Sequence, residues 1–486
     1  MRMTRRTLLV GAGMGAVSVL LASCVPEPTP TKTSTPKPTP TPPPSPIPTP
    51  AAFQRSAWSA DPFSRGAASI TPVGAQAGLR GVLAEPVSER IFLAGEATDE
   101  DAPGTMRGAV SSGKRAADHL LAVAGGDERI AVIGAGLAGA AAAARVAAAD
   151  VNVTVFEARD RTGGRTHAIT DDAWPVTVQL GGWLLSRGDD ELRAGLEDIG
   201  IRVADLQGEG WFGDDGAEIA VEPSGQDPLA GAVEAAKNLP ADVSLADALA
   251  ETGADLDDPI LQATLAYCSA FSGAEADEAS AWFPPVLPTL ELAAPLGDPT
   301  SVIAESLDGV QLTLSSPVTR IAYDDSGLSL RLGTGESLSF DRAIVTAPLG
   351  VLQQQGIEFD PPLPFAYRGA ISALGMGRIE TVWMRFDEPF WQTEAAVWHL
   401  VDTGESAADA SGGEAAEESA GHAADDEPAP VVVRTWINLS AVTGDPVLVG
   451  IVGGDAAGAF AELDDAAVLA AAAESLARFT AEPDES

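Results

Sequence analysis

The chain is poor in three kinds of residue, and each scarcity limits what the protein can be. Only two of its 486 residues are cysteines, Cys24 and Cys268, so no intramolecular disulfide is expected in the mature protein. Lys and Arg number 29 against 70 Asp and Glu, and the formal net charge of −41 disfavours nucleic acid and anionic membrane surfaces as partners. The sequence predicts no metal site, because the spacing of the four histidines is not typical of metal ligands: His119, His167, His399 and His422.

The excess of acid has two interpretations. The first is a solvated acidic surface, and the alternative is a field that attracts cationic substrates. The charge says little about the fold. At 486 residues the chain is long enough for two domains with substantial cores.

Residues 1–24 have the features of an export signal. Arg5-Arg6 is a twin-arginine pair, and the apolar run Thr7–Leu21 that follows is short for a membrane span of about 20 residues. Leu21–Cys24 resembles a bacterial lipobox, whose cysteine is lipidated and becomes the mature N-terminus. The sequence therefore predicts twin-arginine export and a lipid anchor on the outer face of the bacterial cytoplasmic membrane. The alternative is an ordinary cleaved signal in which Cys24 is incidental.

Two segments have compositions that cannot bury a core. Residues 25–52 are rich in Pro and Thr and are expected to form an extended, semi-rigid linker. Residues 403–430 are acidic and low in complexity, and they are interpreted as a disordered surface insertion. An acidic segment that attracts polyamines is the alternative for the second.

The most informative stretch is Arg129–Arg165. The strand-like run Ile130–Ile133 leads into glycines in G-x-G-x-x-G spacing, an alanine-rich helix, a second strand Val151–Phe156, and Glu157. This order predicts a βαβ dinucleotide-binding unit. The residues of the glycine motif expected at the cofactor are Gly134, Ala135, Gly136, Ala138 and Gly139.

Each part of this unit has a physical reason. Gly134 allows the tight turn, Gly136 lets the backbone approach a pyrophosphate, and Gly139 lets helix and strand pack closely. The helix N-terminus holds the phosphates, and Glu157 accepts a hydrogen bond from a ribose hydroxyl. The alternative is a glycine-rich turn in an unrelated α/β fold.

A second glycine pair follows the acid. Residues 158–165 read ARDRTGGR, which resembles FAD enzymes of the glutathione-reductase superfamily and is unusual in NAD dehydrogenases. The resemblance implies cofactor contacts from Ala158, Arg159, Gly164 and Arg165. His167 lies just beyond and is interpreted as a strand-edge histidine.

Another cofactor-binding element is predicted on the N-terminal side of the βαβ dinucleotide-binding unit, which is called the fingerprint below. Arg90–Thr98 reads as a strand and a turn that carries Glu96, and Gly104–Ala109 leads into a helix. A helix N-terminus beside Glu96 is a second site for a polar cofactor group. The residues expected to contact the cofactor here are Gly95, Glu96, Thr105 and Met106.

These motifs resemble the flavin-containing amine oxidase family, which includes monoamine and polyamine oxidases, histone lysine demethylases and L-amino-acid oxidases. In that family the block at Arg90–Ala109 closes the FAD site from the C-terminal end of the chain. Here it precedes the fingerprint, so the chain looks circularly permuted. Gln179–Trp183, Ala343–Leu352 and Gly375–Phe386 also match the family in order. The resemblance implies further FAD contacts from Gly181, Gly182, Trp183 and Val318.

Two departures from the family concern the flavin. Where the family has a lysine near flavin N5, this chain has Thr381, so oxygen reactivity or the flavin environment is expected to differ. Monoamine oxidases attach FAD through a cysteine at the position of Ala67, which cannot form that bond. FAD is therefore expected to be noncovalent.

A third departure concerns the substrate. Ala68 and Thr105 stand where monoamine oxidases have two aromatic side chains that flank the substrate. Trp58 remains as a candidate wall, with an ordinary core tryptophan as the alternative. Trp58 and Thr381 are the two candidate catalytic positions.

The predicted fold is α/β: a Rossmann-type, glutathione-reductase-like FAD domain with an α+β substrate domain, circularly permuted. The expected organisation is a signal (1–24), a linker (25–52), a displaced segment completing the FAD domain (53–124), the βαβ unit and flavin-edge segment (125–235), a first part of the substrate domain (236–300), FAD-domain strands (301–352), a second part of the substrate domain (353–479) and a tail (480–486). If the permutation is real, strand Ile91–Ala94 should lie beside Ile130–Ile133, Glu96 near Gly134, and Phe479 near Phe53 at the surface.

The activity that the resemblance implies is amine oxidation. Hydride would pass from an amine carbon to flavin N5, and oxygen would reoxidise the flavin to give hydrogen peroxide. An FAD dehydrogenase or desaturase using another substrate and acceptor is the first alternative, and a redox-inert FAD-binding surface protein is the second. The sequence does not name the substrate or the oligomeric state.

Overall fold

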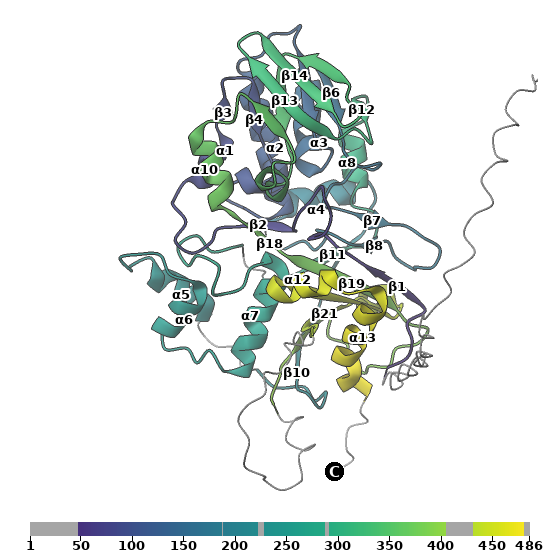
Figure 1. Ribbon diagram of the computed structural model, residues 1–486. Coiled ribbons are helices and arrows are strands. Elements are labelled where there is room, and N and C mark those ends of the chain that lie inside the picture. The colour runs from purple at the N-terminus through teal and green to yellow at the C-terminus, as the bar shows by residue number, and fades with distance from the viewer. Residues whose placement is uncertain (1–46, 187, 222–227, 287–290, 405–430, 481–486) are drawn as a thin grey trace, which may run out of the picture. The chain divides into compact units, whose positions relative to one another are not determined.

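The computed structural model describes residues 47–186, 188–221, 228–286, 291–404 and 431–480, all within one compact unit, Ser45–Ser486 (Figure 1). The predicted export signal, Cys24 as the predicted lipidation site, most of the predicted linker and residues 405–430 of the acidic segment lie outside the described residues. In the described ranges, no helix combines the length and the apolar character that a membrane span needs.

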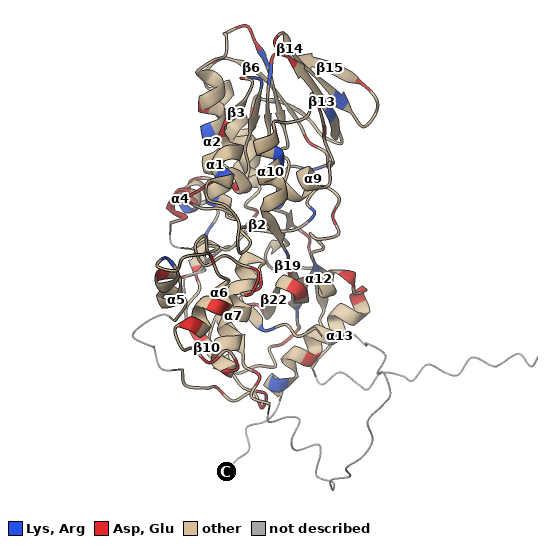
Figure 2. Cartoon of the chain, turned by 60° about the vertical axis from the view of Figure 1, so that its left-hand side comes forward, with Lys and Arg blue, Asp and Glu red and all other residues tan. Residues whose placement is uncertain are grey.

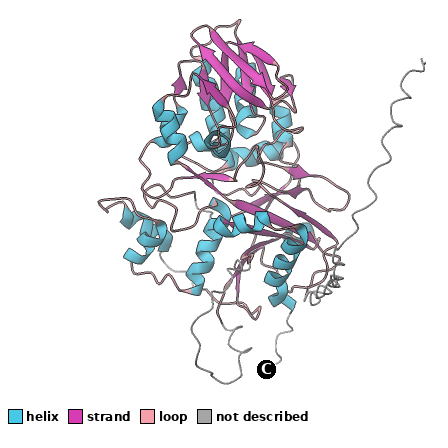
Figure 3. Cartoon of the chain, in the orientation of Figure 1, coloured by secondary structure: helices cyan, strands magenta, loops and turns pink. Residues whose placement is uncertain are grey.

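One six-stranded sheet contains the βαβ unit (Figure 3). Five of its strands are parallel, and the edge strand β3 pairs antiparallel with β4. Short runs rich in Ile, Val and Leu form these strands, as expected for a parallel sheet covered on both faces. In spatial order the strands are β12 (Gln311–Thr313), β6 (Asn152–Phe156), β5 (Arg129–Ile133), β16 (Arg342–Val345), β4 (Ile91–Leu93) and β3 (Pro86–Val87).

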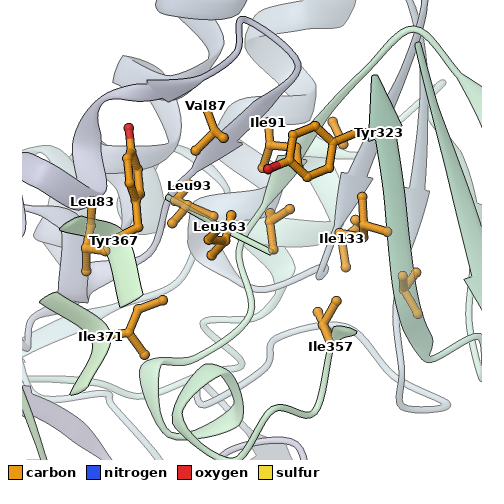
Figure 4. Packing of buried hydrophobic residues seen from close by; sticks show 14 of the residues in the cluster. Leu83, Val87, Ile91, Leu93, Ile133, Tyr323, Ile357, Leu363, Tyr367 and Ile371 are labelled. Carbon is orange, nitrogen blue, oxygen red and sulfur yellow. The ribbon is translucent and has the colours of Figure 1, made fainter. Parts of the chain in front are cut away.

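Alternate side chains of these strands enter two different cores, because successive residues of a strand point to opposite faces. In β5, Ile130 and Val132 pack under the helices α2 (Met106–Leu121), α3 (Leu137–Ala147) and α8 (Ser301–Ser306). Ile133 of the same strand and Leu93 of β4 pack on the other face (Figure 4). There they meet α1 (Leu79–Ala84), α10 (Phe365–Ala373) and a four-stranded sheet: β15 (Ser337–Phe340), β14 (Gly327–Leu332), β13 (Val318–Asp324) and β17 (Glu358–Asp360).

A second six-stranded sheet is mainly antiparallel and holds the most buried tryptophans, among them Trp383, Trp398 and Trp436. Helices α12 (Gly454–Glu462) and α13 (Asp465–Leu476) share its core on one side, and α7 (Pro259–Ser272) shares the core on the other. Its strands in spatial order are β1 (Ala52–Arg55), β19 (Ile379–Arg385), β22 (Val447–Gly453), β21 (Thr435–Asn438), β20 (Val397–Leu400) and β10 (Glu209–Phe212).

The remaining elements are short. Three two-stranded ribbons pair β11 (Ala293–Pro295) with β9 (Val203–Asp205), β18 (Gly375–Gly377) with β2 (Ala68–Ile70), and β7 (Ala168–Ile169) with β8 (Val178–Gln179). The other helices are α4 (Asp190–Asp198), α5 (Pro228–Ala236), α6 (Leu245–Glu251), α9 (Leu349–Gln353) and α11 (Ser440–Thr443).

The segment ahead of the fingerprint pairs with distant parts of the chain. Its strands β1, β2 and β4 pair with β19, β18 and β16 respectively. The expectation that Ile91–Ala94 and Ile130–Ile133 share one sheet is confirmed, but the two strands are not neighbours, because β16 lies between β4 and β5. The reason is that β16 is another short, fully buried strand, and its place in the sheet is set by tertiary packing that local sequence does not reveal.

Ion pairs are found near both ends of the segment that precedes the fingerprint. At its start, Arg55 forms an ion pair of 2.9 Å with Asp465 of α13. Phe53 and Phe479, which the permutation predicts to be neighbours at the surface, are both partly exposed and pack against the same core cluster. At its end, the guanidinium of Arg342 in β16 binds the carboxylate of Glu128 at 2.7 Å, immediately before β5.

Candidate functional site

A cavity of about 430 Å³ lies at the carboxyl ends of the parallel strands. The residues that follow four of these strands line it: Gly134 after β5, Glu157 after β6, Gly95 after β4 and Thr346 after β16. Parallel strands all end at the same edge of a sheet, which is where open α/β folds bind their ligands. The cavity volume is within the usual range for small-molecule and cofactor sites.

The glycine turn has the geometry that its motif predicts. Gly134 has φ of 107°, which an L side chain rarely adopts. A Cβ atom on Gly139 would stand 1.9 Å from the carbonyl oxygen of Gly134, so only glycine lets α3 come this close to the turn. The N-cap Gly136 provides no side-chain cap for α3, and Gly136, Leu137 and Ala138 face the cavity. These uncapped N–H groups and the positive end of the helix dipole suit a phosphate group.

Glu157 is almost fully buried beside this turn. Its Oε2 accepts a hydrogen bond of 2.7 Å from the backbone N–H of Ala135, and its Oε1 accepts one of 2.9 Å from that of Arg159. The carboxylate therefore braces the glycine turn and the loop after β6, in addition to any bond that it makes with a ribose.

Two arginines of that loop bind the segment that precedes the fingerprint. Arg159 donates to the Asp61 carboxylate and to the Ser64 hydroxyl, each at 2.8 Å. Arg165 donates to the Glu96 carboxylate and to the carbonyl oxygen of Ala67, again at 2.8 Å each. Parts of the chain about 70 to 100 residues apart thus form one wall of the cavity.

Glu96 is the most extensively bonded carboxylate of the site. Besides Arg165, it accepts hydrogen bonds from the hydroxyl of Ser69 and from the backbone N–H of Gly104. Burial alone would raise its pKa, but the nearby Arg165, the Ser69 hydroxyl and Arg80 outweigh burial and hold the pKa of Glu96 below its ordinary value. Glu96 is therefore ionised at neutral pH.

The second sheet closes the other end of the cavity. Ile379 and Thr381 project from β19, and Ile451 of β22 is the cross-strand partner of Thr381. The indole N–H of Trp58 donates to the carbonyl oxygen of Leu180 at 2.7 Å, and the Thr381 hydroxyl donates to the same oxygen at 3.3 Å. Both candidate catalytic positions thus border the cavity, with their hydrogen-bond donors already engaged.

The structure brings most of the sequence-predicted residues to this one cavity. Ala135 and Gly139 do not line it. Ala135 is fully buried in the turn, and Gly139 packs against Gly134. The predicted residues that line it are Trp58, Gly95, Glu96, Thr105, Met106, Gly134, Gly136, Ala138, Glu157, Ala158, Arg159, Gly164, Arg165, Gly181, Gly182, Trp183, Val318 and Thr381.

Several other residues that line the cavity were not predicted from the sequence. Phe271 and Ile451 look like ordinary core residues of a helix and a strand, and only tertiary packing brings them to the cavity. Asp189 is mostly buried and its Oδ2 accepts from the Ser186 N–H at 2.8 Å. Its position just before a helix and three residues after a serine is the one local clue to this turn.

His167 immediately precedes β7, and its ring meets the Trp58 ring edge-on, with the centroids 6.5 Å apart. Burial lowers its pKa to about 4, helped by Arg161 and Arg159. His167 is therefore neutral at pH 7. It is not among the described residues that line the cavity.

The fold and the cavity define a class of protein. A glycine turn, a buried acid and a second helix N-terminus around one cavity are the parts of a flavin-type dinucleotide-binding oxidoreductase. Comparison with known families agrees. The profile of the flavin-containing amine oxidoreductase family matches residues 40–121 and 241–486, and an NAD(P)-binding Rossmann-like profile matches residues 132–197. The chain belongs to the flavin-containing amine oxidoreductase family.

Individual relatives are similar over part of their length. Polyamine oxidase 4 of Oryza sativa is 29% identical over 361 residues, which are 68% of each chain. Lysine-specific histone demethylase 1B of Mus musculus is 27% identical, and the match covers 60% of this chain but only 38% of that protein. Among solved structures, a putrescine oxidase has a TM-score of 0.53 at 21% identity, covering 73% of this chain and 82% of its own. Cyclohexylamine oxidase from Brevibacterium oxydans gives 0.53 at 21%, covering 70% and 78%.

Membership of this family makes the protein an FAD-dependent oxidoreductase. The residues present fit FAD. Uncapped N–H groups of α3 face the cavity for a pyrophosphate, and Glu157 lies beside them as an acceptor for a ribose hydroxyl. The α2 N-terminus, with Thr105 as its N-cap, provides a second polar end.

The first prediction concerns Glu157. Replacing Glu157 with Ala should weaken FAD binding by about 1–3 kcal/mol, or about 5- to 150-fold in Kd. The reason is that two buried N–H groups lose their acceptor and the ribose loses its partner. The measurement is a flavin-fluorescence titration of apoprotein with FAD, with the exposed loop variant Asp160→Ala as control. Equal affinity in Glu157→Ala and wild type would remove Glu157 from the site.

Proposed function

We propose that the protein oxidises an amine, using oxygen as electron acceptor. Bound FAD would supply the hydride acceptor for the carbon that bears the nitrogen, and the imine product would be hydrolysed by water to an aldehyde or ketone. Reoxidation by oxygen gives hydrogen peroxide. The observation that carries the proposal is the junction within one cavity: the cofactor-binding turn leads directly to an apolar end formed by the second sheet.

The side chains at that end have two tasks. An amine can lose hydride only when its nitrogen is neutral, and an apolar wall lowers an amine pKa because it disfavours the charged form. Trp58, Trp183 and Ile451 supply such a wall and exclude water. The related putrescine and cyclohexylamine oxidases support an amine as the substrate.

The choice of acceptor rests on β19. Thr381 lines the cavity, and the resemblance puts it at the family's lysine position; the three charged residues near it in sequence do not line the cavity. Arg378 pairs with Asp455, Glu380 binds the 56–59 segment, and Arg385 borders a separate surface pocket. Among the described residues of β19, none supplies a charge to the cavity. This observation favours a dehydrogenase with another acceptor as the second candidate.

We also propose that the chain is a circular permutation of the family, with residues 53–124 as its displaced C-terminal part. Two features support this. The displaced strands pair with β16, β18 and β19, which come late in the chain. Arg55 binds Asp465 of α13, so the start of the segment lies at the helix that would precede it in family order.

Export through the twin-arginine route and a lipid anchor at Cys24 remain part of the proposal. The twin-arginine route carries folded proteins, which suits an enzyme that takes up FAD before export. Membrane fractionation of cells producing the wild type and Cys24→Ser tests the anchor. Equal release of both from the membrane fraction would count against it.

The function itself is tested by a panel of primary, secondary and cyclic amines on the purified yellow protein. We expect at least one amine to bleach the flavin in oxygen-free buffer and to release hydrogen peroxide in air. Bleaching without peroxide would favour the dehydrogenase. A flavin that no amine bleaches, although light reduces it, would contradict amine oxidation.

FAD is expected to be held without a covalent bond. Ala67 stands at the attachment position, and no Cys, His or Tyr is found among the described residues that line the cavity. Acid precipitation should therefore release the yellow colour into the supernatant. Colour retained by the precipitated protein would show a covalent bond.

The variant Thr381→Lys is expected to speed reoxidation of the reduced flavin by oxygen. The physical reason is that an ammonium at the cavity end stabilises the negative charge that develops on oxygen as it is reduced. Stopped-flow mixing of the reduced protein with oxygenated buffer measures this rate. Thr381→Met controls for side-chain size, and an equal gain in both variants, or none in either, would refute the role of charge.

A further inference from the structure

We infer that the substrate is an amine with one charged nitrogen and an apolar body, and not a diamine or polyamine. The inference rests on the proposed function and specifies the substrate class of the same cavity. It separates this chain from relatives that are named for polyamines and putrescine.

The apolar end of the cavity is the first observation. Four apolar side chains from the second sheet or from segments that pack beside it lie there: Phe271 of α7, Leu292 just before β11, Ile379 of β19 and Ile451 of β22. Thr381 is the polar exception, and its hydroxyl already donates to Leu180. A second ammonium in this region would lose its water without gaining an acceptor, which strongly disfavours it.

The second observation is that every carboxylate among the described lining residues is already engaged. Glu96 binds Arg165, and Glu157 accepts from two backbone N–H groups. Asp189 accepts from the backbone and hydroxyl of Ser186, and Arg107 lies 3.8 Å from its other oxygen. Glu96 and Glu157 thus belong to the cofactor end of the cavity, and the charge of Asp189 is balanced by Arg107, so none of the three is an unpaired carboxylate at the apolar end.

The third observation concerns Glu380, the carboxylate nearest to the apolar end in sequence. Neighbouring side chains of a strand point to opposite faces, so Ile379 and Thr381 face the cavity while Glu380 faces away. Its oxygens accept from the Ser56 hydroxyl at 2.6 Å and from the N–H groups of Trp58 and Ser59 at 3.0 Å each. Despite these bonds, burial raises the pKa of Glu380. The Glu380 carboxylate is therefore buried on the face of β19 that points away from the cavity.

The acidic surface does not change this conclusion. Figure 2 shows Asp and Glu on helices such as α4, α6 and α12, and the net charge of −41 raises the concentration of every cation near the protein. Monoamines and diamines are both attracted. The cavity decides between them, because only there does the second ammonium lose its water.

The test compares n-hexylamine with 1,6-diaminohexane on the FAD-loaded protein in oxygen-free buffer. A shift of the flavin absorption band reports binding, and loss of the band reports oxidation. We expect hexylamine to bind at least tenfold more tightly, and butyl-, pentyl- and hexylamine to gain about fourfold per methylene. Equal or tighter binding of the diamine would overturn the inference.

A pair of variants adds an independent arm. Ile379→Glu places a carboxylate at the apolar end and should bring the diamine to at least equal affinity, while the uncharged Ile379→Gln should not. A preference for hexylamine that Ile379→Glu leaves unchanged would contradict the inference. Hexylamine could bind more tightly than the diamine while no amine bleaches the flavin. That result would support the inferred binding preference of the cavity and contradict the proposed amine oxidation.

Discussion

The buried ion pair between Arg165 and Glu96 is the contact on which the cofactor cavity depends. Arg165 lies in the glycine-rich loop after β6, and Glu96 begins the short 3-10 turn that follows β4. Glu96 is buried and Arg165 is mostly so, and loss of Arg165 would leave the Glu96 carboxylate with Arg80 nearby and its hydrogen bonds from Ser69 and Gly104. A second contact of the same kind, Arg159 with Asp61, lies along the same wall. Together these pairs make two distant stretches of sequence into one site.

This arrangement explains how one cavity can serve two kinds of chemistry. Charged groups surround the cofactor end, where they are paired with one another or with backbone N–H groups. Apolar side chains of the second sheet surround the other end. A polar dinucleotide and an apolar amine can therefore lie in contact without either entering an unsuitable environment. Thr381 stands at the apolar end of the cavity, beside Ile379 and Ile451.

The sequence was informative wherever a local constraint acts. The spacing of Gly134, Gly136 and Gly139 predicted a turn that the structure confirms, because positive φ and close packing depend on a few adjacent residues. The order of strands that come from distant parts of the chain was harder to predict. Nothing local distinguishes β16 from other buried runs, so its position between β4 and β5 was missed. The apolar end was missed for a similar reason, since Phe271 and Ile451 read as core residues. Family resemblance supplied part of what local patterns could not, including Trp183 and Thr381.

The central claim is that the segment ahead of the fingerprint forms one wall of the FAD site. A protease site placed in the exposed joint at residues 125–127 tests it most directly, since cleavage there separates the segment from the fingerprint covalently. After cleavage of the FAD-loaded protein, gel filtration should give one species that contains both fragments and all of the flavin. Separation of the fragments, with flavin retained by the larger one alone, would contradict the account.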